Sequence, residues 1–240
     1  MSESDAESVS REVAQRVFAA EFNDASYTFK ESDDDRAPVY LLLPTGERAN
    51  RIFVVGTLTE TEDVGEDNEY WRGRIVDPTG TFFVYAGQYQ PDAASALREL
   101  EPPAYVAVVG KPRTYETDEG GINVSVRPES ITEVDAATRD QWVVETADRT
   151  LDRIDAFDAA GNEYARMAGE EYGDVGSNYT ETVVEGLGSL ETTDELGADV
   201  AADTDGDRSG STDDDIEGDA VDTADPSPRD GLLSRMPSSA

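Results

Sequence analysis

The chain has 240 residues, a formal net charge of -35 and neither cysteine nor histidine, which excludes disulfides, thiolate metal sites and the histidine bases of most hydrolases. Such an excess of carboxylates is typical of proteins that work in molar salt, where the Debye length falls to about 3 Å and repulsion between surface carboxylates is screened. The acidity therefore describes the solvent first, and it does not argue against a nucleic-acid partner.

Residues 1–50 predict a short helix followed by edge strands. A helical period begins near Ser8, after serine and acidic residues, and runs to Phe22. The apolar face of this expected helix consists of Val13, Val17, Phe18 and Phe22. Residues 27–30 and 39–43 follow as an apolar pair or edge strand, closed by a Pro-Thr-Gly turn.

From Arg51 the apolar residues alternate with a period of two, which predicts β-strands. The first strand runs from Ile52 to Leu58 and contains Gly56, which we expect at a bulge or sharp bend. Two more strands, at 69–76 and 81–86, are joined by an Asp-Pro-Thr-Gly turn. A short helix with proline at its start follows at 91–100.

Two further strands complete the pattern. The fourth runs from Tyr105 to Tyr115, a Gly-Gly turn follows, and the fifth begins at Ile122. Three strands, a helix and two strands is the order of an OB-fold, a partly open barrel that binds oligonucleotides. We therefore expect a mainly β fold, with a five-stranded OB-fold barrel at 51–135 flanked by amphipathic helices.

A second amphipathic helix and an acidic tail are expected after the barrel. The helix runs from Ala136 to about Phe157, and we assign residues 136–160 to an assembly helix. Residues 161–240 are rich in Asp, Glu, Gly, Ser and Thr, which predicts a largely disordered acidic tail. Residues 163–172 are a candidate helix within it, and the apolar residues 231–237 are a candidate docking peptide for other proteins.

The candidate nucleic-acid-binding residues are cations and tyrosines on the expected strands. Phosphates need cations and bases need flat stacking partners, and alternation along a strand places both on one face. The candidates are Arg72, Arg74, Tyr85, Tyr89, Lys111, Arg113, Tyr115 and Arg127. The alternative reading is that these cations merely pair with the abundant carboxylates.

The remaining aromatic residues of the barrel are expected in its core. Trp71 lies one position away from Arg72, so it belongs to the opposite face. Phe82 and Phe83 are also assigned to the core, whereas the hydroxyl groups of Tyr85 and Tyr89 favour contact with water.

Two long strings carry a family resemblance. VDPTGTFFVYAGQYQP at 76–91 and PPAYVAVVGKPR at 102–113 resemble the haloarchaeal replication protein A-associated proteins, OB-fold subunits similar to the middle subunit of eukaryotic replication protein A. The resemblance covers about 12–157. It implies an accessory subunit that binds single-stranded DNA and works with a larger replication protein A subunit in DNA replication and repair.

The resemblance also implies roles for particular positions. A stacking aromatic after the third strand would be at Gln88 or Tyr89, and another at the end of the fourth strand would be Tyr115. A helix after the barrel mediates assembly in that family. The partner-binding residues would then be Trp142, Val143, Leu151, Ile154 and Phe157. The winged helix of the eukaryotic subunit has no counterpart in the acidic tail.

Other functions remain open from sequence. The barrel carries more acidic than basic residues, which favours an alternative in which it is a scaffold that contacts the large subunit without binding DNA. An OB module that binds RNA is a weaker alternative. We expect no enzyme, because no nucleophile lies beside a base. We also expect no cofactor and no metal site. With no basic leader or long apolar run, we expect a cytoplasmic protein without a membrane span.

Overall fold

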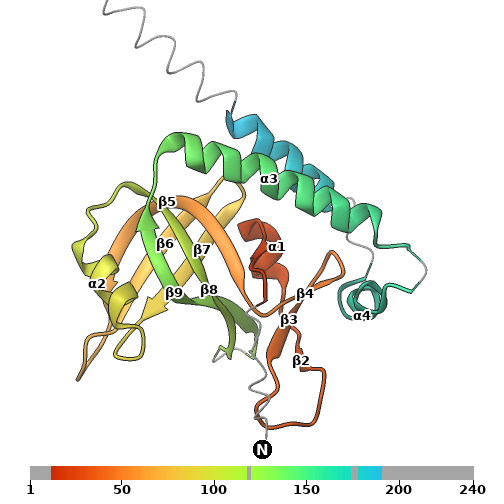
Figure 1. Cartoon of the computed structure of the whole chain (residues 1–240), viewed down its shortest axis with the longest axis horizontal. Helices are drawn as coiled ribbons and strands as arrows, with labels where there is room; N and C mark the ends of the chain where they lie inside the picture. The colour runs from red at the N-terminus through yellow and green to blue at the C-terminus, as the bar shows by residue number, and fades with distance from the viewer. Residues whose placement is uncertain (1–11, 118–119, 160, 174–177, 191–240) are drawn as a thin grey trace, which may run out of the picture.

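A five-stranded barrel forms the centre of the structure, a computed structural model that describes residues 12–117, 120–159, 161–173 and 178–190 (Figure 1). Its strands are β5 (Ile52–Asp63), β6 (Trp71–Asp77), β7 (Gly80–Ala86), β8 (Ala104–Glu116) and β9 (Ile122–Glu133). They pair antiparallel except for β7 and β9, which pair parallel, and β5 meets β8 to close the sheet. The helix α2 (Pro91–Glu99) lies between β7 and β8 in the chain. This order confirms the predicted OB-fold barrel.

The barrel closes because β5 bends and serves two neighbours. Residues 52–58 pair with β8, residues 57–63 pair with β6, and a register shift lies between Leu58 and Glu60. The bulge is thus two residues beyond Gly56, where it was expected. Gly56 is needed for another reason, because a Cβ there would lie 2.5 Å from the carbonyl oxygen of Val76. Glycine lets the two backbones approach at the bend.

The interior of the barrel is filled by alternate residues of the strands and by α2. The fully buried side chains include Ile52, Val54, Leu58, Ile75, Phe82, Val84, Leu97, Val106 and Val108. Trp71 is partly buried and packs against this core, as its position in the strand predicted. The outer faces of the same strands are therefore free to carry polar and aromatic groups.

The N-terminal segment differs from its prediction. Within the described residues the expected helix from Ser8 to Phe22 is replaced by a short strand, β1 (Gln15–Arg16), parallel to β5, and by the helix α1 (Ala19–Asp24). The carboxylate of Asp77 accepts the N–H of Ala19 at 2.8 Å, and Thr79 Oγ1 accepts that of Ala20 at 3.1 Å. The turn between β6 and β7 thus fixes the start of α1.

A small three-stranded antiparallel sheet packs beside the barrel (Figure 1). It consists of β2 (Thr28–Lys30), β3 (Val39–Leu43) and β4 (Glu47–Ala49). The first two strands confirm the predicted pair, but β4 was not predicted because three residues are too few to show a period. Gly46, with φ of 83°, makes the turn between β3 and β4.

Helices cover one end of the molecule. α3 (Ala136–Asp155) follows the barrel as predicted and begins at Asp135, whose carboxylate accepts the N–H of Thr138 at 2.8 Å. It runs across the barrel and the small sheet, and the helix at 178–190 lies along it (Figure 1). α4 (Glu163–Tyr172) packs against β3 and β4. Among the described residues no helix is long and apolar enough to cross a membrane.

The prediction of disorder from residue 161 onward is wrong for part of that range. Besides α4, the expected candidate helix, residues 178–190 form a helix in which Tyr179 and Val183 are each 3 % exposed. Tyr179 donates a hydrogen bond to Asp24 at 2.9 Å, which docks this helix on α1. Residues 191–240, including the candidate docking peptide at 231–237, lie outside the described residues.

A buried ion pair connects α3 to the N-terminal segment. Arg153 Nη2 lies 2.5 Å from a carboxylate oxygen of Glu21, and Arg153 Nε donates to Thr45 Oγ1 at 2.7 Å. Thr45 in turn donates to Glu21. The Glu21 side chain is 0 % exposed and that of Arg153 is 6 % exposed, so neither group can exchange its partner for water. The helix after the barrel is therefore an integral part of this fold.

Candidate nucleic-acid interface

A cleft of about 370 Å³ lies between the start of α2 and the paired strands β8 and β9. Four of the predicted nucleic-acid-binding residues line it, namely Tyr89, Lys111, Arg113 and Arg127. Lys111 and Arg127 are directly opposite each other in the β8–β9 register. Arg113 is two residues further along β8, and thus on the same face. The structure brings together side chains from three separate segments.

The cations of this cleft make no ion pair within the described residues. No ion pair joins Lys111, Arg113 or Arg127 to any carboxylate that the structure describes. The neighbouring Arg51 is different, because it is paired with Glu129 at the rim of the cleft. In so acidic a chain, three cations without a described carboxylate partner leave positive charge in this cleft uncompensated within the described residues.

Of the two arginines of β6, Arg72 follows the alternative reading, in which the cations pair with carboxylates, and Arg74 does not. Arg72 lies 2.6 Å from a carboxylate oxygen of Glu62 and 3.4 Å from one of Glu60. Arg74 makes no ion pair with a described carboxylate and donates instead to Thr59 and Thr81, at 3.3 and 3.4 Å. Arg72 would have to exchange two carboxylates for a phosphate, so it is a weaker contact than the cations of the cleft.

Tyrosines gather on the outer face next to these cations. Tyr85 is opposite Arg72 in the β6–β7 register, and its ring stacks on that of Tyr70, with centroids 5.8 Å apart. Burial, and next the nearby Tyr115, raise the pKa of Tyr85 above its ordinary value. Tyr115 is 45 % exposed and Tyr89 is 77 % exposed. Flat rings are thus available beside the cations.

Two members of this face were not predicted. Tyr70 ends the loop between β5 and β6. It lies inside the predicted strand at 69–76, two positions before Arg72, so alternation along that strand would have placed it on the face of Arg72 and Arg74. Phe83 was assigned to the core, but it is only half-buried and lies opposite Arg74, on the same face as Tyr85. Strict alternation after the fully buried Phe82 would have placed Phe83 outside.

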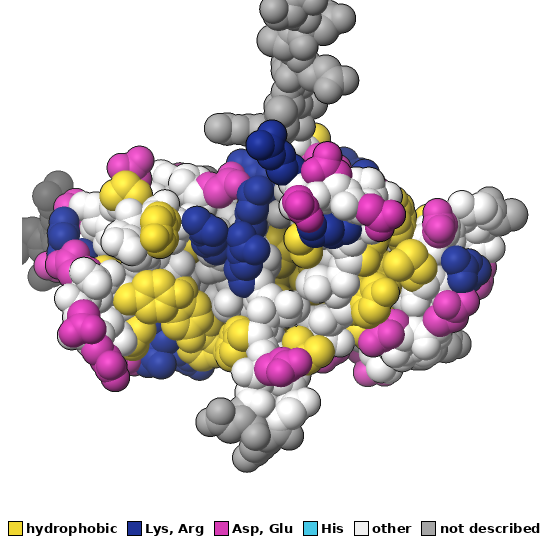
Figure 2. Space-filling model, turned by 90° about the horizontal axis from the view of Figure 1, so that it is seen from below, with side chains coloured by type: hydrophobic (Ala, Val, Ile, Leu, Met, Phe, Trp, Pro, Cys, Tyr) yellow, Lys and Arg dark blue, Asp and Glu magenta, His cyan; other side chains and the backbone are white. Residues whose placement is uncertain are grey.

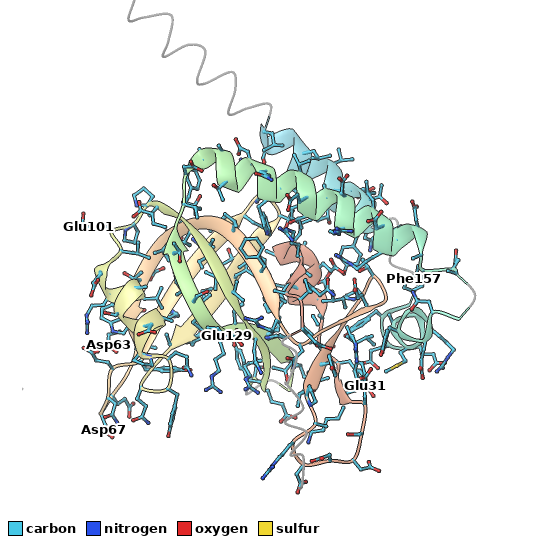
Figure 3. All side chains as sticks on the ribbon, in the orientation of Figure 1. Glu31, Asp63, Asp67, Glu101, Glu129 and Phe157 are labelled. Atoms are coloured by element: carbon cyan, nitrogen blue, oxygen red, sulfur yellow. The ribbon has the colours of Figure 1, made fainter. Side chains whose placement is uncertain are left out.

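The position of Tyr70 is set by a carboxylate at the end of β5. Asp63 accepts the N–H groups of Gly65 and Tyr70, each at 3.0 Å, and these hydrogen bonds lower the pKa of its carboxyl group. Figure 3 shows Asp63 and Asp67 beside this loop, with Glu129 nearer the middle of the molecule. The loop is folded back so that Tyr70 reaches Tyr85.

The face of the molecule below β8 and β9 in Figure 1 carries both cationic and hydrophobic side chains. Seen from below in Figure 2, Lys and Arg side chains gather near the middle of the face, and hydrophobic side chains form a group to their left. Acidic side chains lie at the left edge and over the right half of this view, and some lie beside the Lys and Arg side chains. The face as a whole therefore combines charge and apolar surface, as a single-stranded nucleic acid requires.

Two of the five predicted partner-binding residues in and after α3 are buried inside the chain. Trp142 is 2 % exposed and donates its indole N–H to the carbonyl of Phe53 at 3.0 Å, and Val143 is fully buried. These two are core residues, because the chain's own barrel and N-terminal segment cover this face of α3. Ile154 and Phe157 are half-buried, and Leu151 is exposed. A partner could reach Leu151 without disturbing the core.

No protein-family model matches the sequence, and no curated protein matches it. Solved structures with a similar fold include the second single-stranded DNA-binding protein of Mycobacterium smegmatis, at 21% identity and a TM-score of 0.31, over 37% of this chain and 89% of that one. The mitochondrial single-stranded DNA-binding protein Rim1 of S. cerevisiae matches at 21% identity and a TM-score of 0.29, over 36% of this chain and 94% of that one. An OBody bound to hen egg-white lysozyme matches at 16% identity and a TM-score of 0.29, over 35% of this chain and 80% of that one. At these identities and TM-scores the matches carry no argument about function, and it is the strand order of the barrel that makes it an OB-fold.

Proposed function

We propose that this chain binds single-stranded DNA on the face formed by β6 to β9, as an accessory subunit of a replication protein A complex in DNA replication and repair. One observation carries the proposal. Lys111, Arg113 and Arg127 converge on one cleft and have no carboxylate partner among the residues that the structure describes, in a chain whose net charge is -35. Beside them Tyr85 and Tyr115 supply surfaces for bases.

The arrangement suits binding in molar salt. At a Debye length of about 3 Å, long-range attraction to the DNA backbone is lost, and only direct contacts remain. Hydrogen bonds from cations to phosphate are charge-assisted and survive as short contacts. Stacking of a base on an aromatic ring contributes about 1–3 kcal/mol and does not depend on charge. A few unpaired cations together with several tyrosines are therefore sufficient.

Fluorescence anisotropy with labelled oligo-dT in molar KCl tests this proposal. Arg113→Gln should weaken binding about tenfold or more, since a hydrogen bond to a charged group contributes about 1.5–3 kcal/mol. Tyr115→Ala should weaken it by the stacking contribution of about 1–3 kcal/mol. The matched control is Arg166→Gln, which removes the same charge from an exposed position on α4. Equal affinity of all the variants would refute the proposal, and competition by tRNA as strong as by oligo-dT would favour RNA.

A second candidate function is assembly with a larger subunit, without direct contact to DNA. Exposed apolar side chains on the helical end favour it, namely Val144, Leu151, Val184 and Leu187. The two helices that carry them are joined by a hydrogen bond from Arg139 to Ser189, at 3.3 Å. Leu151→Asp should then abolish co-purification with the large subunit, while Arg113→Gln leaves the DNA affinity of the complex unchanged. The opposite pattern would support the DNA-binding proposal.

A further inference from the structure

The cations of the cleft beside α2 differ from those on the rest of the proposed DNA face in the partners that they contact. On β6, Arg72 is neutralised by Glu60 and Glu62, and Arg74 bonds to threonine hydroxyls. Lys111, Arg113 and Arg127 are instead gathered in one cleft, and no ion pair joins them to a carboxylate in the part of the chain that the structure describes. A strand bound only through its internal phosphodiesters has one charge per nucleotide, spread along the backbone. A concentrated group of cations matches a concentrated charge better.

We propose that this cleft holds a phosphate monoester, the group that ends a DNA strand or that a free nucleotide carries. This inference deepens the proposed function and rests on it. A monoester carries a charge of about -1.5 to -2 at neutral pH and three acceptor oxygens, against a single charge on a phosphodiester. Lys111, Arg113 and Arg127 can each donate to one of these oxygens.

The walls of the cleft fit the same ligand. Its volume of about 370 Å³ is at the lower end of small-molecule sites, which span about 300–1,000 Å³, so it suits one nucleotide rather than a run of them. Tyr89, 77 % exposed, lines the cleft and offers a ring for the terminal base. The N-cap residue of α2, Gln90, makes no side-chain capping bond, and Pro91 has no N–H, so the N–H groups of Asp92 and Ala93 are left to support the anion.

Two carboxylates also line the cleft, and neither removes its cations. Glu129 is engaged by Arg51, and Asp92 is in the first turn of α2. Neither carboxylate forms an ion pair with Lys111, Arg113 or Arg127 in the part of the chain that the structure describes. The positive groups of the cleft are thus available to a ligand.

Anisotropy in molar KCl with two pairs of labelled oligo-dT tests the inference. One pair carries a 5′-phosphate or a 5′-hydroxyl, and the other carries a 3′-phosphate or a 3′-hydroxyl. At one end the phosphorylated strand should bind about tenfold more tightly. Arg127→Gln should bring this ratio close to one. Tyr85→Ala should weaken both members of the pair and keep the ratio, and Arg166→Gln should change neither affinity.

Competition with free dTMP identifies the source of the monoester. Displacement of the phosphorylated strand by dTMP, but not by thymidine, would show that a free nucleotide also fits, which supports the monoester site. Equal affinity for phosphorylated and unphosphorylated strands at both ends, with no effect of dTMP, would overturn the inference. If Arg113→Gln still weakens both strands in that case, the proposed function stands without it.

Discussion

Removing one partner of the buried pair between Glu21 and Arg153 should destabilise the fold strongly. In Glu21→Leu the guanidinium of Arg153, 6 % exposed, loses its carboxylate and keeps only the hydroxyl groups of Thr45 and Thr150 and the carbonyl of Arg16. Loss of one partner of a buried ion pair costs about 3–5 kcal/mol. That is a large part of a typical stability of about 5–15 kcal/mol.

Urea unfolding in molar KCl, followed by circular dichroism, measures this cost. The double variant Glu21→Leu/Arg153→Leu should recover most of the loss, because it removes both charges together. Asp152→Asn is the matched control, since it breaks the exposed pair with Arg149 and should change stability by less than about 0.5 kcal/mol. A loss below about 1 kcal/mol in Glu21→Leu, or a double variant as unstable as the sum of the single ones, would refute the reasoning.

Three further predictions concern packing, pH and the outer face. Gly46→Ala should lower the free energy of unfolding by about 2–3 kcal/mol, measured by thermal unfolding, because φ is 83° and a Cβ would lie 2.7 Å from the backbone of α4. Gly120→Ala is the control: φ is 79° there but no atom lies within 4 Å of the added Cβ, so the loss should be about 1 kcal/mol. Burial and the hydrogen bond to Asp24 raise the pKa of Tyr179 above its ordinary value, so this group stabilises the fold below about pH 10, and that contribution is lost as the pH rises further. A Tyr179→Phe variant should therefore lose less stability than the wild type above about pH 10. Equal pH dependence of the two proteins would count against the docking of helix 178–190 on α1. Phe83→Ala should weaken oligo-dT binding by about 1–3 kcal/mol and leave the melting temperature nearly unchanged, and unchanged affinity would remove Phe83 from the interface.

The sequence predicted the barrel well because its signals are local. Period-two alternation, the Asp-Pro-Thr-Gly turn and the helix with proline at its start all depend on neighbouring residues. The start of α1 could not be predicted in the same way, because it is fixed by Asp77 and Thr79 from a distant turn. β4 was missed because Glu47–Ala49 is too short to show a pattern.

The candidate site was predicted in its residue types but only partly in its arrangement. Alternation placed Lys111, Arg113 and Tyr115 on one face, and the pairing of β8 with β9 brought Arg127 to it. The pairing of Arg72 with two glutamates needed the three-dimensional register of β5 and β6.

The helical end was misjudged because a period shows only that a face is buried. It does not show what covers that face. The sequence therefore assigned Trp142 and Val143 to a partner, although the chain itself covers them. The helix at 178–190 was missed for a related reason, because the acidic and glycine-rich composition of residues 161–240 as a whole hides the few residues that dock it, such as Tyr179.

Hydrogen exchange with and without saturating oligo-dT, in molar KCl, tests the central claim most directly, because it shows where the DNA lies. The account predicts slower amide exchange in the loop between β5 and β6, at 87–93, and at 111–117 and 120–127 of β8 and β9. It predicts no change in α3, α4 and the helix at 178–190. Unchanged exchange across the barrel face, or protection confined to those helices, would contradict it.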